Sequence, residues 1–174
     1  PIKEKQESET TTARATIHIK DQEPNDRFFY CGDSQAGALH ENNGGSQSAV
    51  HYNNNGRSQV GAGPKAILTD ITNNIASLRG KTLVLSPGAD NTNTDSTNTY
   101  KQMAALLREN NIPYIIIPPG NTNAKNQHLE SLTTAFGAEN ILNTSSVSVS
   151  KIDHTHYNPR QLQQAIDNQY PTVA

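Results

Sequence analysis

The sequence predicts an α/β fold in which helices cover both faces of a parallel sheet. Short apolar runs alternate with segments whose apolar residues recur at helical spacing, and the links between them are short. Two of the runs, Thr82–Ser86 and Ile112–Ile117, are apolar almost throughout, which is typical of strands covered on both sides. Because parallel crossovers need a covering helix, we expect three layers, α/β/α, around a five-stranded sheet.

The five expected strands share a short apolar run that is bounded by turn-forming residues. Glycine, proline or asparagine follows most of them, as in the Asn-Asn-Asn-Gly turn at residues 53–56. The expected strands are Phe28–Cys31, Ala49–Asn53, Thr82–Ser86, Ile112–Ile117 and Glu139–Leu142.

The expected helices carry apolar residues three or four positions apart on one face. The clearest begins at Pro64, which suits a first helical position, and continues through Ile67, Ile71 and Leu78 until Gly80 ends it. The other helices are expected at Gln35–His40, Tyr100–Asn110, Ala124–Phe136 and from Pro159 onward.

The first 26 residues differ from the rest in being polar and charged. Within this polar lead, residues 1–26, we interpret Pro1–Thr12 as a flexible lead or a junction to a missing segment. Ala15–Ile19 alternates and predicts an added edge strand. Residues 27–174 are expected to form one domain. A chain of 174 residues is long enough to bury about two-thirds of its unfolded surface in a single core.

Composition limits the classes of partner. The net charge is −2 and there is no basic stripe with interleaved aromatic residues, so we expect no nucleic acid. No apolar stretch approaches the roughly 20 residues that span a bilayer, so we expect no membrane partner. Hydrophobic content is only 33%, and the many Asn, Thr, Ser and Gln residues favour long polar loops that meet polar ligands such as glycans. The single cysteine, Cys31, lies in the first apolar run and suits a small buried residue better than a reactive thiol.

Ser34 is the candidate nucleophile, because it follows the first expected strand in the sequence Gly32-Asp33-Ser34. In open α/β sheets the carboxyl ends of the strands are where ligands bind. A serine there is well placed for covalent catalysis if a base can reach it. The same three residue types also make ordinary turns, so the serine needs a partner elsewhere in the chain.

The candidate partners form the sequence Asp153-His154-Thr155-His156. His156 is the expected general base, because an unperturbed histidine has a pKa of about 6.5. Asp153 would accept from its other ring nitrogen and fix its tautomer. His154 competes for the role of base, but an adjacent residue points away from where Asp153 can orient it.

The Asp153–His156 motif has two alternative interpretations, a polar loop that caps the last helix and a metal site at His154 and His156. No further Cys/His cluster supports a metal, so we expect neither metal nor cofactor.

Gly-Asp-Ser near the start and Asp-x-x-His near the end together resemble the SGNH (GDSL-type) hydrolases. The resemblance runs from about Arg27 to Asn168, and it is strongest to short SGNH domains of bacteriophage virion proteins. It implies a flavodoxin-like strand order and a serine esterase whose catalytic triad is Ser34, His156 and Asp153.

The resemblance also implies an oxyanion hole made of the Ser34 N–H, a glycine after the second strand and an asparagine after the third. The glycine falls in a Gly-Ala-Gly turn, where we expect Gly61 to serve, with Gly63 next; these glycines equally suit a helix-entry turn. The asparagine block reads Gly-Ala-Asp-Asn and departs from the family pattern Gly-x-Asn-Asp. Asp90 holds the expected position, where a carboxylate would repel an oxyanion, so we assign the role to Asn91.

The expected function is hydrolysis of O-acyl groups, acetyl above all, from a polysaccharide or cell-surface glycan, because the polar loops offer no obvious apolar acyl channel. One alternative is a phage-associated peptidoglycan hydrolase. Another is a non-catalytic glycan-binding or structural virion module. This alternative is favoured by the displaced asparagine, which stands at Asn91 while Asp90 holds the position that the family pattern gives to asparagine. Either way, we expect an extracellular or virion-associated location, with the chain forming part of a larger virion polypeptide.

Overall fold

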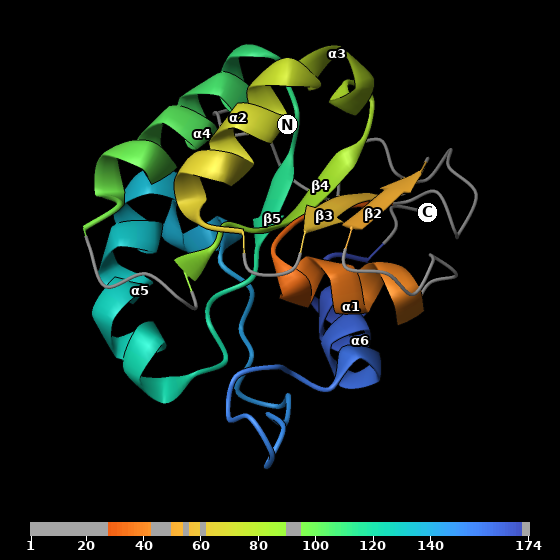
Figure 1. The fold of residues 1–174 in the computed structure, drawn as a ribbon, viewed down its shortest axis with the longest axis vertical. Helices are drawn as coiled ribbons and strands as arrows, with labels where there is room; N and C mark the ends of the chain where they lie inside the picture. The colour runs from red at the N-terminus through yellow and green to blue at the C-terminus, as the bar shows by residue number, and fades with distance from the viewer. Residues whose placement is uncertain (1–27, 43–49, 54–55, 60–61, 90–94, 172–174) are drawn as a thin grey trace.

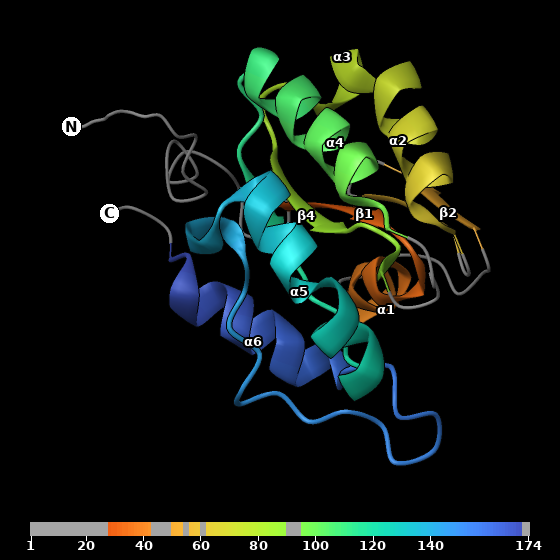
Figure 2. The same cartoon turned by 90° about the vertical axis from the view of Figure 1, so that its left-hand side faces the viewer.

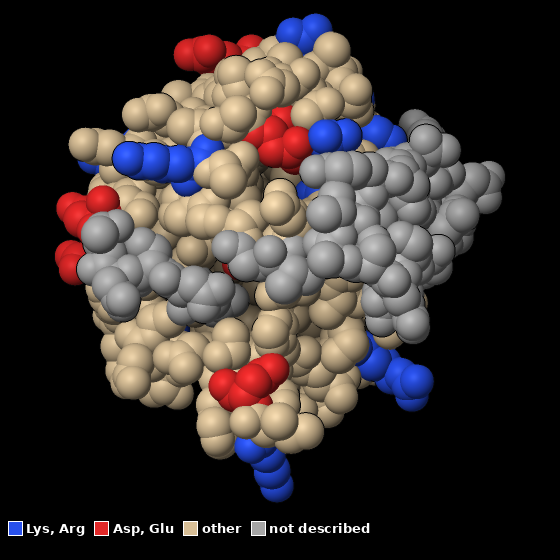
Figure 3. All heavy atoms as spheres, in the orientation of Figure 1, with Lys and Arg blue, Asp and Glu red and all other residues tan. Residues whose placement is uncertain are grey.

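The protein has an α/β fold with a core of four parallel strands and helices on both faces of the sheet (Figures 1 and 2). The computed structural model describes residues 28–42, 50–53, 56–59, 62–89 and 95–171. The expected lead 1–26, with its edge strand Ala15–Ile19, lies outside the described residues. In the part of the chain that is described, no helix combines the length and the apolar character needed to cross a membrane. Acidic and basic side chains are interspersed on the face shown in Figure 3.

The sheet has the strand order β2-β3-β1-β4-β5, in which β3, β1, β4 and β5 run parallel and β2 pairs antiparallel with β3. Tyr30 of β1 lies opposite Gly56 of β3 and Val84 of β4, and Val84 in turn lies opposite Ile115 of β5. The strands are β1 (Phe28–Gly32), β2 (Val50–Asn53), β3 (Gly56–Gln59), β4 (Thr82–Ser86) and β5 (Tyr114–Ile116).

The expected five-stranded parallel sheet is not confirmed, because two of its strands differ. The expected second strand is β2, and only two residues separate it from β3. A link that short can join antiparallel strands only, since a parallel pair needs a crossover of a dozen residues or more. The expected strand Glu139–Leu142 is instead a 3₁₀ helix, η4 (Ala138–Asn140), followed by a single parallel bridge between Ile116 and Ile141. The Asn140 side chain donates to the Phe136 carbonyl and holds this segment in a turn.

All the expected helices are present, but the one expected from Pro64 to Leu78 is divided at Asn74. The Asn74 side-chain Nδ2 donates to the Asp70 carbonyl, while the Asn74 backbone N–H bonds to Ile71, so the regular helical ladder is interrupted. The helices are α1 (Ser34–Asn42), α2 (Pro64–Asn73), α3 (Ile75–Leu78), α4 (Thr97–Glu109), α5 (Thr122–Phe136) and α6 (Pro159–Gln169).

Alternate residues of the strands enter two apolar clusters, one on each face of the sheet. Phe29 and Cys31 of β1 pack with α2, α4 and α5, whereas Phe28 and Tyr30 pack with α1 and α6. Cys31 is 1% exposed, and burial raises the pKa of its thiol. The prediction that Cys31 is a small buried residue is therefore confirmed.

Candidate active site

The site begins where β1 ends against the end of β4. Gly32 has φ 129°, a backbone conformation that favours glycine, and a Cβ at this position would overlap the Ser86 carbonyl oxygen. The next residue, Asp33, donates its backbone N–H to the same carbonyl at 3.2 Å. Glycine is therefore required for β1 to approach β4 closely and turn directly into α1.

Asp33 caps the N-terminus of α1. Its buried carboxylate accepts the Gln35 N–H at 3.0 Å and is also hydrogen-bonded by the Ala36 backbone and the Ser86 side chain. Burial raises the pKa of Asp33, while the hydrogen bonds and the nearby His156 act in the opposite direction. These contacts fix the first turn of α1, and half-buried Ser34 opens that turn.

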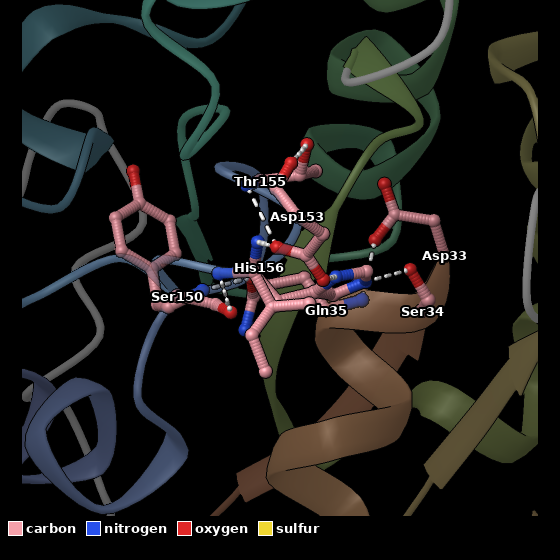
Figure 4. Close-up of polar contacts among 9 residues, drawn as sticks. Asp33, Ser34, Gln35, Ser150, Asp153, Thr155 and His156 are labelled. Atoms are coloured by element: carbon pink, nitrogen blue, oxygen red, sulfur yellow. Dashed lines mark hydrogen bonds and ion pairs between the residues drawn. The ribbon is translucent and has the colours of Figure 1, made fainter.

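Ser34, His156 and Asp153 form a hydrogen-bonded chain (Figure 4). Ser34 Oγ lies 2.6 Å from His156 Nε2, although the two residues are 122 positions apart. On the other side of the ring, His156 Nδ1 lies 2.8 Å from Asp153 Oδ2. The His156 side chain is 37% exposed and that of Asp153 45%, so the chain of bonds lies at the surface, within reach of solutes. The structure thus brings together the three residues that the sequence motifs indicate.

Asp153 organises the loop that carries the imidazole. Its Oδ1 accepts the backbone N–H groups of Thr155 at 2.9 Å and His156 at 3.1 Å. These two bonds, followed by the bond from the His156 ring, lower the pKa of Asp153 to about 2. The carboxylate is then ionised at neutral pH and can only accept, so His156 Nδ1 carries a proton. In the neutral ring, Nε2 is left free to accept from the Ser34 hydroxyl.

His154, the competing base, has a different environment. It is exposed, its φ is 57°, and its backbone N–H bonds to the Ser150 carbonyl. The side chains of Ser34 and Asp153 bond to His156 instead. Within the described ranges, no three His, Cys, Asp or Glu side chains are grouped so that they could hold a metal ion.

The loop that carries Asp153 and His156 is fastened to the segment after β5. The buried Tyr157 hydroxyl lies 2.9 Å from the carbonyl oxygens of both Pro118 and Pro119. Gly120 packs against the Thr155 carbonyl so closely that a Cβ would overlap it. These contacts hold the loop against the segment that follows β5.

Two of the three expected oxyanion-hole residues, Gly61 and Asn91, lie outside the described residues, as does Asp90. Their described neighbours touch each other. Gly88 has φ 84°, and a Cβ there would lie only 2.8 Å from the Gly63 carbonyl carbon. The turn that leads into α2 therefore packs directly on the turn that follows β4.

A small pocket of about 50 Å³ lies where β1 and β3 end against α2. Its lining includes Gly32, two residues before Ser34, together with Ser58, Ala62 and Ile67. The lining also includes Arg57 and Asp70, which form an ion pair with N···O 2.9 Å.

Two residues of the site were not among the sequence-based candidates. Asp33 could have been found, because an aspartate just before a helix is a common N-cap. Gln35 accepts the Tyr157 backbone N–H through its side chain, and no local pattern indicates a bond between residues 122 positions apart.

No protein-family model matches the sequence, and no curated protein matches it. The SGNH resemblance therefore stays a prediction that rests on the motifs at Ser34, in the two loops of the expected oxyanion hole and at Asp153–His156.

Proposed function

We propose that this protein is a serine hydrolase of the SGNH type that cleaves ester bonds. Ser34 is the nucleophile, His156 the general base and Asp153 the residue that orients and stabilises the imidazole. The observation that carries the proposal is the continuous chain of two hydrogen bonds, 2.6 Å and 2.8 Å long, from Ser34 Oγ through His156 to Asp153. Each ring nitrogen has the partner that this chemistry needs.

In the proposed reaction, Ser34 Oγ attacks the ester carbonyl carbon while His156 Nε2 takes the hydroxyl proton. Asp153 stabilises the imidazolium that forms. The imidazolium then gives its proton to the leaving alcohol oxygen as the carbon–oxygen bond breaks, which leaves an acyl group on Ser34. Water attacks the acyl-enzyme with the same base, and the carboxylic acid departs.

The oxyanion of the tetrahedral intermediate needs preorganised donors. We assign these to the Ser34 N–H, the Gly61 N–H and the Asn91 side-chain amide. Two observations support the assignment. Ser34 opens α1, where the helix dipole favours negative charge. The turns next to Gly61 and Asn91 also touch each other through Gly63 and Gly88.

The order of the parallel strands supports the family proposal. Numbered along the chain, the parallel strands lie in the order second, first, third and fourth. The bridge at Ile141 extends the sheet at the place where a fifth strand would follow β5. We infer a flavodoxin-like arrangement in which the fifth strand is reduced to one bridge.

We propose short O-acyl groups, acetyl above all, on a polysaccharide or cell-surface glycan as the substrate. The exposed His156 and Asp153 side chains favour a bulky polar alcohol that stays in solvent. The small pocket that Gly32 helps to line favours a short acyl group over a long chain. An extracellular or virion-associated setting, within a larger virion polypeptide, fits such a substrate.

The direct test is hydrolysis of a short-chain aryl ester by the wild type and by Ser34→Ala. We expect turnover by the wild type and a fall in kcat of about 10³-fold or more in the variant, as for other serine nucleophiles. Ser77→Ala, at an exposed position of α3, is the matched control and should behave like the wild type. Equal turnover by Ser34→Ala would remove Ser34 from the mechanism.

The substrate class can be tested with acetylated glycan and with purified cell wall. Release of acetate from the glycan alone would support the proposal. Solubilised wall fragments would favour a peptidoglycan hydrolase. Glycan binding without acetate release would favour a non-catalytic module, the alternative that the displaced asparagine at Asn91 favours.

A further inference from the structure

Gln35 makes a second link between α1 and the loop that carries His156. Its side-chain Oε1 accepts the Tyr157 backbone N–H at 2.9 Å, one residue along from the bond between Ser34 and His156. Both pairs are 122 positions apart, so two consecutive residues of α1 hold two consecutive residues of the loop. Figure 4 shows Gln35 and Ser34 next to His156.

Stability alone does not explain a glutamine at position 35. The side chain is 1% exposed, and its Nε2 has no hydrogen-bond partner in the described part of the chain. Burying an unpaired amide nitrogen costs at least as much as one neutral hydrogen bond contributes net. An apolar side chain of similar volume would fill the same space without that cost, but it would lose the bond to the Tyr157 N–H. Only a polar side chain at position 35 supplies an acceptor for the Tyr157 backbone N–H.

The rest of the loop gives His156 little support from α1. Lys151 to His154 are exposed, and Ile152 is 95% exposed. The Tyr157 hydroxyl anchors the loop to Pro118 and Pro119, which follow β5 rather than α1. The bond to Gln35 instead ties the peptide next to His156 to the helix that holds the nucleophile.

We propose that Gln35 is a positioning residue that sets the place of the His156 ring relative to Ser34 Oγ. The kinetic form of this proposal rests on the proposed hydrolase function. A misplacement of about 1 Å can slow an enzyme by about 100-fold, so a single well-placed acceptor matters.

The test compares Gln35→Met with Gln35→Glu, which keeps an acceptor oxygen of the same reach. We expect Gln35→Met to lower kcat by about 10–100-fold with little change in KM. Its melting temperature should stay close to that of the wild type, because the substitution removes the cost of the unpaired buried Nε2 together with the bond to the Tyr157 N–H. Gln35→Glu should recover most of kcat at the high-pH plateau.

Gln169→Met is the matched control, because it removes a glutamine side chain that bonds to the backbone of Asn143, far along α6. It should leave kcat unchanged. The proposal is overturned if Gln35→Met keeps the wild-type kcat, if Gln35→Glu is as slow as Gln35→Met, or if melting temperature and kcat fall together.

If the proposed function is wrong, the wild type will turn over the aryl ester no faster than Ser34→Ala does, which distinguishes this failure from a failure of the positioning role. The NMR signal of His156 Nε2 then decides the positioning role without turnover. We expect it to shift in Gln35→Met and to stay in place in Gln169→Met, and an unshifted signal in Gln35→Met would overturn the proposal.

Discussion

At Asp153 the two carboxylate oxygens have separate roles. Oδ1 holds the turn by accepting from Thr155 and His156, and Oδ2 meets the imidazole. A single side chain therefore shapes the loop and sets the tautomer of the base. The sequence indicated this pair, because three positions along one turn bring a carboxylate to a histidine. It could not indicate Gln35, whose partner lies at the other end of the chain.

Asp153→Asn separates the two roles. Asparagine keeps Oδ1 for the turn, but its Nδ2 presents a donor to His156 Nδ1 and forces the ring proton onto Nε2, which then cannot accept from Ser34. We expect kcat to fall by about 10²–10⁴-fold while circular dichroism shows an intact fold. Steady-state kinetics on an aryl ester measure this, and a kcat close to that of the wild type would show that Asp153 has no catalytic role.

Among the elements, α1 depends on the two residues before it. Gly32 allows β1 to approach β4, and Asp33 caps the helix, so Ser34 enters the first turn in a fixed position. The apolar run predicted this strand, and the alanine-rich stretch at Gln35–His40 predicted the helix. Elsewhere, apolar runs and helical repeats failed at residues 139–142, where the Asn140 side chain favours a turn, and at Asn74, whose side chain competes with the helix backbone.

Substitutions at Asp33 test the cap. Asp33→Ala removes the acceptor for the first amides of α1 and should lower the free energy of unfolding by about 0.5–2 kcal/mol. Asp33→Asn keeps an acceptor oxygen and removes a buried charge, whose pKa is raised by burial, so its loss should be smaller. Chemical denaturation measures both. An Asp33→Asn variant less stable than Asp33→Ala would contradict the capping role.

Across the whole molecule, the sheet brings the two ends of the described chain to one edge. Motif order predicted that Ser34 and Asp153–His156 would meet there, because the carboxyl ends of parallel strands share an edge. The loop that carries His156 is anchored to the segment after β5 by Tyr157 on Pro118 and Pro119 and by Gly120 against Thr155, and to α1 by the bond between Tyr157 and Gln35. These contacts join residues far apart in the chain, so no local sequence pattern indicates them.

The free energy of unfolding should depend on pH in acid because of Asp153. Its pKa is lowered from 3.8 to about 2 in the fold, so its ionised form stabilises the protein above about pH 4, and this contribution is lost as the pH falls through about 2. We expect the difference in unfolding free energy between the wild type and Asp153→Asn to be constant above that range and to shrink within it. Asp33, whose pKa is raised, acts in the opposite direction but is common to both proteins. A difference that stays constant down to pH 2 would contradict the assignment.

Covalent labelling with a fluorophosphonate asks whether Ser34 is an activated nucleophile, because only an activated serine reacts readily with this reagent. We expect one adduct, on Ser34, identified by peptide mass spectrometry, and its loss in His156→Ala. An unlabelled wild type, or a label on any other serine, would contradict the assignment of Ser34 as the nucleophile.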